Sequence, residues 1–427
     1  MLKPSNSLDF NKLLLHQRYI WMYTSVTHMT VKPYLIIFLL FVNYSFSMAQ
    51  HNANYEESKV PDLILPDPFV SLKGKLISTQ LDWEEIRRPE ILNLFRENVY
   101  GNIPADFDTI SFSEVQESEN PYPEKAILKE VNIAVVRNGK SHTMRLNVFL
   151  PKSKKGPFPI FLLINHRPNP GNGELVEEGY WSVAELIDRG YATASFHGET
   201  VAPDDAERYS EGILNTLYPE ELTKDDGMKT LGAWAWGAMR AMDYFEQDSL
   251  FDTKKSALVG HSRSGKATLW AAANDKRWAV AFPNESGCGG AAISRRKYGE
   301  TIAQINSRFP HWFAENFTAF NDQEETLPVD QHMLASLIAP RALYFASARE
   351  DQWADPKGEY ISIQLGSKVY SEIYGQNVNF PLAFEELDSP IIQPLAGYHI
   401  REGKHNLTWE DWQHFIDFAE LQWNQFR

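Results

Sequence analysis

From residue 158 onward, short apolar runs alternate with longer stretches in which apolar residues recur every three or four positions. The apolar runs lie at 158–166, 191–198, 255–262, 277–286, 341–351 and 394–403. Helical periods lie at 180–190, 230–247 and 265–275, and a last helix is expected from Thr408, where a Thr-x-x-Asp spacing indicates a helix start. Uniformly apolar strands that alternate with helices predict an α/β fold, with a mostly parallel sheet covered by helices on both faces.

The pattern before residue 158 is different. Residues 82–104 predict a helix that ends in a Gly-Asn-Ile-Pro turn. Two β-rich runs at 125–136 and 142–151 flank the pair Asn138-Gly139, which is typical of a hairpin. We therefore expect an antiparallel pair beside the parallel strands. No internal repeat or low-complexity linker divides the sequence, so one domain is expected from about residue 62 to 427.

The N-terminal region resembles a secretory signal peptide. A short basic start at Met29 precedes the apolar run 34–42, and small residues at Ser47 and Ala49 precede Gln50. The run is too short for a comfortable membrane span. We expect translation to start at Met29, cleavage between Ala49 and Gln50, a flexible linker at 50–61, and a secreted or periplasmic protein without a membrane span.

Composition excludes some functions. Aspartate and glutamate outnumber lysine and arginine by 56 to 41, which gives a net charge of −15. Nucleic-acid binding depends on basic patches and is not expected. The one cysteine, Cys288, allows no disulfide within the chain and is expected to be a small buried residue. The sequence shows no metal-ligand cluster and no phosphate-binding loop, so no metal or cofactor is expected, and the protein is expected to act as a monomer.

The strongest chemical signal is Gly-His-Ser-Arg-Ser-Gly at 260–265, between a predicted strand and a predicted helix. Ser262 would stand on the strand-to-helix bend used by the nucleophile of α/β-hydrolases, with Gly260 and Gly265 allowing close packing. The alternative is a serine that only caps the helix. The backbone N–H of Arg263 is the usual first oxyanion donor on this bend, and its guanidinium is either a further donor or a surface group.

A serine hydroxyl needs an adjacent base, and the fold delivers it in the last loop. His405 occupies that loop. Two acids compete to orient its imidazole. Asp351 follows the next-to-last strand, which is the usual place, whereas Glu285 follows the strand directly after the bend. His261 is set aside because side chains of adjacent residues rarely reach each other productively.

Several segments resemble the glucuronoyl esterases, carbohydrate esterase family 15, which have the α/β-hydrolase fold. These segments are GHSRSGKATLW, NESGCGGAAISRRKYGE, FPHWF, LPVDQHMLASLIAPR and REDQWADPKGE. The resemblance implies a secreted serine esterase that cleaves esters of 4-O-methylglucuronic acid, as in cross-links between glucuronoxylan and lignin. It makes Ser262 the nucleophile, His405 the base and Arg263 the oxyanion arginine. Glu285 matches the family's acid, and Asp351 matches the alternative acid of bacterial members, so Glu285 is favoured with Asp351 in support.

The resemblance also assigns substrate-binding residues. Lys266 and Glu300 match contacts to sugar hydroxyls, and Trp353 matches a contact to the sugar ring and its methoxy group. The family's histidine is often followed by aspartate, whereas this chain has Asn406. Two alternatives remain open at this stage: an acetylxylan-type esterase on the same fold, and a xylan-binding protein that has lost turnover.

Overall fold

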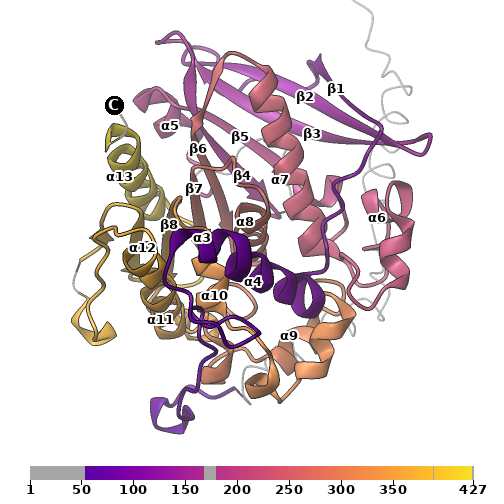
Figure 1. Cartoon of the computed structure of the whole chain (residues 1–427). Helices are drawn as coiled ribbons and strands as arrows, with labels where there is room; N and C mark the ends of the chain where they lie inside the picture. The colour runs from indigo at the N-terminus through magenta and orange to yellow at the C-terminus, as the bar shows by residue number, and fades with distance from the viewer. Residues whose placement is uncertain (1–52, 168–178, 388, 426–427) are drawn as a thin grey trace, which may run out of the picture. The chain divides into compact units, whose positions relative to one another are not determined.

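Ten strands form one sheet in the order β1-β2-β3-β5-β4-β6-β7-β8-β10-β9 (Figure 1). The computed structural model describes residues 53–167, 179–387 and 389–425. The strands are β1 Thr109–Val115, β2 Ala126–Arg137, β3 Lys140–Pro151, β4 Phe158–Asn165, β5 Ala192–His197, β6 Phe251–His261, β7 Val280–Asn284, β8 Ala342–Ala348, β9 Ile391–Ile392 and β10 Ala396–Arg401.

The pairing confirms the predicted mixture. Strands β5, β4, β6, β7, β8 and β10 run parallel to one another. At one end of the sheet, β1, β2, β3 and β5 pair antiparallel in that order, and at the other end β9 pairs antiparallel with β10. The predicted hairpin turn is present, with positive φ at Asn138 (52°) and Gly139 (73°). Two edge strands, β1 and β9, were not predicted. Residues of β1 are exposed or half-buried, so the strand has no continuous apolar run, although Ile110 and Phe112 alternate with polar residues and pack against the core.

Helices cover both faces of the sheet. They are α3 Gln80–Asp82, α4 Arg88–Phe95, α5 Val183–Arg189, α6 Ile213–Thr216, α7 Thr230–Gln247, α8 Arg263–Asn274, α9 Ile302–Arg308, α10 Gln331–Ser336, α11 Pro356–Gly366, α12 Lys368–Glu372 and α13 Trp409–Gln425. The two apolar cores divide according to the alternation of the strands. Ile160, Leu162 and Ile164 of β4 join the core of α7 and α8, whereas Phe161 and Leu163 join that of α5 and α13.

The predicted helix at 82–104 is one continuous helical stretch at 80–100. It consists of α3, a π-helical turn Trp83–Arg87, α4 and a second π-helical turn Arg96–Tyr100. It ends at Gly101, where φ is 80° and a Cβ would lie 2.6 Å from the backbone of Gly227. The last helix begins as predicted after Thr408, whose N–H and hydroxyl both donate to the Asp411 carboxylate, at 2.7 and 2.8 Å.

The N-terminal predictions are only partly within the described residues. The proposed signal peptide and its cleavage point lie outside them. The compact unit begins at Ala53, so residues 53–61 of the expected linker at 50–61 belong to it. Over the described residues, no helix is both long and apolar enough to cross a bilayer.

Candidate active site

Ser262 lies on a strained bend between β6 and α8. Its φ of 56° and ψ of −123° fall outside the regions that side chains with a Cβ normally adopt. The bend is tight because a Cβ on Gly260 would lie 2.3 Å from the Ser264 carbonyl oxygen. A Cβ on Gly265 would lie 2.8 Å from Ser286. Both glycines predicted to permit close packing therefore do so, and Ser262 stands at the N-terminus of a buried helix.

The other predicted residues follow the neighbouring strands. Glu285 comes directly after β7, Asp351 follows β8, and His405 follows β10. Because β6, β7, β8 and β10 are adjacent and parallel, the ends of all four strands meet at one edge of the sheet. Glu285 also has a positive φ of 44°, a second strained backbone position at this edge.

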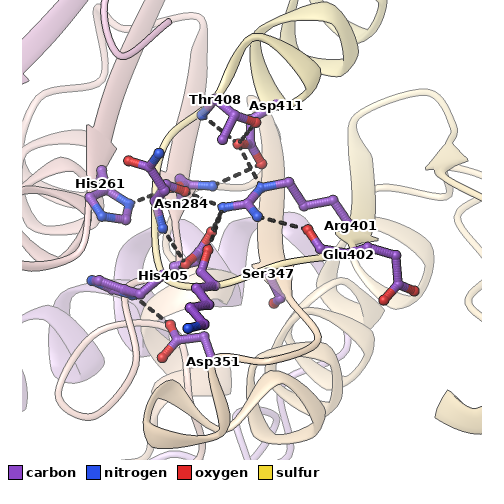
Figure 2. Close-up of polar contacts among 12 residues, drawn as sticks. His261, Asn284, Ser347, Asp351, Arg401, Glu402, His405, Thr408 and Asp411 are labelled. Atoms are coloured by element: carbon purple, nitrogen blue, oxygen red, sulfur yellow. Dashed lines mark hydrogen bonds and ion pairs between the residues drawn. The ribbon is translucent and has the colours of Figure 1, made fainter.

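His405 is bound by both candidate acids. Its Nδ1 lies 2.6 Å from Asp351 Oδ2 and 3.2 Å from Glu285 Oε2 (Figure 2 shows the Asp351 contact). Both carboxylates are buried, while 42% of the His405 side chain stays exposed. Although partial burial opposes the charged form, the hydrogen bonds to Asp351 and Glu285 raise the pKa of His405 to about 9. Because Nδ1 donates to carboxylates, the remaining nitrogen Nε2 is the one available for proton transfer.

Glu285 is supported by a buried network of Arg401, Asp411 and Asn284, the three of which Figure 2 labels. Arg401 Nη2 donates to Glu285 Oε1 at 2.5 Å, and Arg401 Nε donates to Asp411 Oδ2 at 2.9 Å. The Asn284 amide donates to Asp411 Oδ1 at 3.1 Å. Burial raises the pKa of Glu285 to about 7, against the opposing charges of His405 and Arg401. The network thus ties the loops after β7 and β10 to the start of α13.

His261, which the sequence argument set aside, is the last member of this network. Its Nδ1 donates to Asn284 Oδ1 at 2.5 Å, and its ring centroid lies 4.4 Å from that of His405. Burial lowers the pKa of His261 well below its usual value. The residue next to Ser262 therefore packs as a neutral ring against His405, which brings the loop at 405 to the bend.

The guanidinium of Arg263 is fixed by residues that the sequence did not indicate. Its Nη1 lies 2.5 Å from Asp204 Oδ2, and its Cζ lies 4.7 Å from the centroid of the Trp312 ring. Asp204 also accepts hydrogen bonds from His311 Nε2 at 2.9 Å and Trp312 Nε1 at 2.6 Å. Although burial opposes ionisation, these hydrogen bonds and the charge of Arg263 hold the pKa of Asp204 well below its usual value.

Lys266 is buried beneath the bend. Its Nζ donates to the backbone carbonyls of Ser286 and Cys288, the latter at 2.7 Å. Burial lowers the pKa of Lys266, and the charge of Glu300 opposes this. Lys266 therefore fastens the loop that follows Glu285. Cys288 is buried, as predicted.

Glu300 and Trp353 are linked to each other. The Glu300 backbone N–H donates to the Trp353 carbonyl oxygen at 3.0 Å, and the two side chains are also hydrogen-bonded. Both residues are half-buried. Burial raises the pKa of Glu300, whereas Lys266 lowers it. The electrostatic contact with Lys266 connects this pair to the base of the bend.

Comparison with known proteins identifies the family. A model of fungal glucuronyl esterases matches residues 133–374. Carbohydrate esterase MZ0003, from an unknown prokaryotic organism, is 37% identical over 86% of this chain and 91% of its own. This chain belongs to the glucuronoyl esterase family. Like its relatives, it is a carboxylic ester hydrolase.

Two solved structures and a fungal relative agree with this family. A glucuronoyl esterase from Solibacter usitatus has a TM-score of 0.79 at 34% identity, over 86% of this chain and 100% of the other. A promiscuous CE15 esterase from a marine bacterial metagenome has a TM-score of 0.75 at 35% identity, over 86% of this chain and 99% of the other. The 4-O-methyl-glucuronoyl methylesterase of Neurospora crassa is 28% identical over 75% of each chain. The α/β-hydrolase fold expected for this family is confirmed.

One group of side chains in this esterase has the spacing of metal ligands. Over the described residues, the ligand atoms of Glu285, Asp351 and His405 lie within 4.8 Å of one another. A metal ion would hold each ligand at about 2 Å. The direct contact of 2.6 Å between His405 and Asp351 is instead that of a short, charge-assisted hydrogen bond. We interpret the group as acid–base machinery.

Two further residues at this edge make hydrogen bonds that the sequence did not indicate. The backbone N–H of Asn406 donates to Glu285 Oε2 at 3.0 Å, and its amide oxygen accepts a hydrogen bond from Arg167. Glu359, on α11, accepts hydrogen bonds from the Gly287 N–H at 2.8 Å and from the Ser347 hydroxyl. Burial raises the pKa of Glu359 to about 8. Both residues hold the loop that carries Glu285.

Proposed function

We propose that this esterase hydrolyses esters of glucuronic acid and its 4-O-methyl derivative through a covalent intermediate on Ser262. One observation carries the proposal: His405, held by two buried carboxylates, lies against the histidine that adjoins the strained Ser262. Fungal relatives named 4-O-methyl-glucuronoyl methylesterases support the substrate class. A hydroxyl is a weak nucleophile at neutral pH and needs such a base.

Acylation would begin with attack of Ser262 Oγ on the ester carbonyl carbon, while the hydroxyl proton passes to His405 Nε2. The carbonyl oxygen becomes an oxyanion. The backbone N–H of Arg263, at the first position of α8, and its guanidinium are the proposed donors to that oxygen. A preorganised donor of this kind contributes about 3–4 kcal/mol to the transition state. Collapse breaks the bond to the alcohol, which leaves with the proton from Nε2.

Deacylation would repeat these steps with water. Nε2 of His405 accepts a proton from water, and the resulting hydroxide attacks the uronoyl-serine ester. The second oxyanion collapses, Ser262 Oγ recovers the proton, and the free uronic acid departs. Because His405 carries a raised pKa, the neutral imidazole that accepts protons becomes more abundant as the pH rises toward about 9.

The two acids would divide the work. Asp351 makes the shorter contact with His405, at 2.6 Å, whereas Glu285 lies at 3.2 Å and also accepts from Arg401 and the Asn406 N–H. We therefore assign Asp351 the larger share in holding the imidazole tautomer. Glu285 adds negative charge and anchors the loop at 405. This reverses the order favoured from the sequence alone.

Substrate recognition would use the groups around the bend. Lys266 and Glu300 are suited to sugar hydroxyls, and Trp353 offers an aromatic surface to the ring. An exported enzyme meeting glucuronoxylan–lignin material fits the predicted signal peptide. The acetylxylan-type alternative would require no charged contacts to a uronate ring.

The experiment compares methyl glucuronate, its galacturonate epimer and an acetylated xylose, with the wild type and Ser262→Ala. We expect methanol release from methyl glucuronate by the wild type and its loss in the variant. Unchanged methanol release by Ser262→Ala would contradict the mechanism. Cleavage of the acetyl ester alone would replace this proposal with the acetylxylan-type activity.

A further inference from the structure

The segment that precedes the sheet is fastened beside the candidate site. The Asn54 carbonyl oxygen accepts from the Gly299 N–H at 2.9 Å. Glu57 Oε1 lies 2.5 Å from Arg296 Nη2, and Arg296 Nε lies 2.7 Å from the buried Asp355. These contacts hold both ends of the four-residue stretch 54–57. The side chain between them, Tyr55, is therefore presented in a defined place.

Tyr55 lies beside the segment that leads to Glu300, since its neighbour Asn54 accepts from the Gly299 N–H. Its ring meets the Tyr298 ring edge-on, with centroids 6.0 Å apart, and 40% of the residue stays exposed. Partial burial, Tyr298, Asp351 and Glu300 each raise the pKa of Tyr55. The Tyr55 hydroxyl thus lies within the field of two carboxylates: one binds His405 and the other binds Trp353. A core aromatic would be covered, and this one is not.

A pocket of about 440 Å³ has Tyr298 in its lining. Its walls combine the rings of Tyr298 and Phe384 with polar side chains, which include Arg349, Gln352, Lys357 and Glu385. The cations are already paired: Lys357 lies 2.7 Å from Glu385, and Arg349 lies 2.8 Å from Glu402. Such a lining offers apolar faces and hydrogen-bonding groups without a net positive charge. That combination suits a neutral sugar better than an anion or a purely aromatic group.

We propose that Tyr55 and this pocket form a second sugar subsite, which takes a neutral pyranose of the chain that bears the uronate. The ring of Tyr55 bridges the two places, since it adjoins the acids of the site and contacts a wall of the pocket. This inference rests on the proposed function for its place in catalysis. It makes the N-terminal segment a specificity-determining part of the enzyme.

The test compares a methyl glucuronate monosaccharide with the same ester carried on a short xylo-oligosaccharide. In Tyr55→Ala we expect the ratio of kcat/KM for the oligosaccharide to that for the monosaccharide to fall about 3- to 10-fold, since an aromatic contact is lost. Tyr55→Phe keeps the ring and should keep the ratio. Glu57→Gln, which weakens the docking of the segment, should lower it in part. Leu72→Ala is the control, because Leu72 is an exposed apolar residue that precedes the first strand of the sheet in the chain, and it should leave the ratio unchanged.

An unchanged ratio in Tyr55→Ala would overturn the subsite. So would a fall that appears only when benzyl glucuronate replaces methyl glucuronate, because the ring would then serve an aromatic alcohol. Binding of xylotriose to Ser262→Ala, measured by calorimetry, separates this proposal from the proposed function. If the wild type cleaves no glucuronate ester, the function fails. The subsite fails if adding Tyr55→Ala leaves xylotriose affinity intact.

Discussion

The molecular surface beside β2 and the strand ends around Ser262 hold their charged pairs in different surroundings. On the surface, Lys125, directly before β2, lies 2.6 Å from Asp188 of α5, with 51% and 54% of the side chains exposed. At the site, Arg401 lies 2.9 Å from Asp411, with 3% and 0% exposed. The distances are similar, but the surroundings are not. An exposed pair contributes about 0–1 kcal/mol, whereas loss of one partner from a buried pair costs about 3–5 kcal/mol.

The difference shows where this fold tolerates expensive arrangements. Burying an ion pair is a poor way to gain stability, since desolvation offsets the attraction. The strand ends nevertheless hold buried charges at Glu285, Asp351, Arg401 and Asp411, together with strained φ angles at Ser262 and Glu285. We conclude that this edge is organised to orient groups rather than to gain stability from its charges.

Ser262→Ala should give the largest effect. We expect kcat on methyl glucuronate to fall on the order of 10⁴-fold or more, because the covalent route is lost. The free energy of unfolding should change by less than about 1 kcal/mol, since no buried charge is exposed. Steady-state kinetics and urea denaturation measure the two quantities. Retention of substantial activity would show that another group attacks the ester.

Arg401→Met should remove the cation of the buried ion pairs and destabilise the fold. It leaves Glu285 and Asp411 without their shared cation, so we expect the free energy of unfolding to fall by about 3–5 kcal/mol. Urea denaturation followed by tryptophan fluorescence measures this change. A double variant, Arg401→Met with Asp411→Asn, should recover part of the loss. A loss below about 1 kcal/mol in the single variant would mean that these charges are not held away from water.

Asp351→Asn should affect both rate and pH dependence. We expect kcat/KM to fall on the order of 10²-fold, less than for removal of the only acid of a triad, because Glu285 remains. His405 loses its shorter carboxylate contact, so its pKa falls. Protonated His405 cannot accept a proton, so activity rises with pH through that pKa, and the rising limb should move from near pH 9 toward lower pH. Glu285→Gln is the matched variant, with a smaller loss of rate expected. An unmoved limb in both variants would assign the titration to another group.

Lys125→Met should give the smallest effect and serves as the exposed counterpart of Arg401→Met. We expect its free energy of unfolding to change by less than about 1 kcal/mol, with activity unchanged. The same denaturation experiment applies, at low and at moderate salt. A loss comparable to that of Arg401→Met would erase the contrast between the two regions.

Much of the fold could be predicted because buried faces of strands and helices require apolar residues at regular spacings in the sequence. The helix at 230–247 was predicted to the residue, and the strands around Ser262 were found within a few positions. Strand β1 was missed because its apolar alternation is short, Ile110 and Phe112 among polar residues, and none of its residues is fully buried. Positions after predicted strands indicated Ser262, Glu285, Asp351 and His405, and the structure brings all four to one edge of the sheet. The resemblance to the family added the substrate-binding residues.

Other parts of the site left weaker signals. Asp204 lies in a loop far from Arg263 in sequence, and nothing in its surroundings marks it as a partner. His261 was set aside because adjacent side chains seldom meet, yet it reaches the loop at 405 by packing rather than by proton transfer. Arg401 did leave a signal: a charged residue at the end of the apolar run 394–403 implies a buried partner, and that reasoning would have led to Asp411 or Glu285.

Labelling with a fluorophosphonate probe, with the modified peptide located by mass spectrometry, tests most directly whether the hydroxyl on the strained bend is the activated group. We expect one label per chain, on Ser262, formed more slowly in Asp351→Asn and suppressed by methyl glucuronate. A label on another residue, or an unlabelled but active enzyme, would contradict the assignment of Ser262 as the nucleophile.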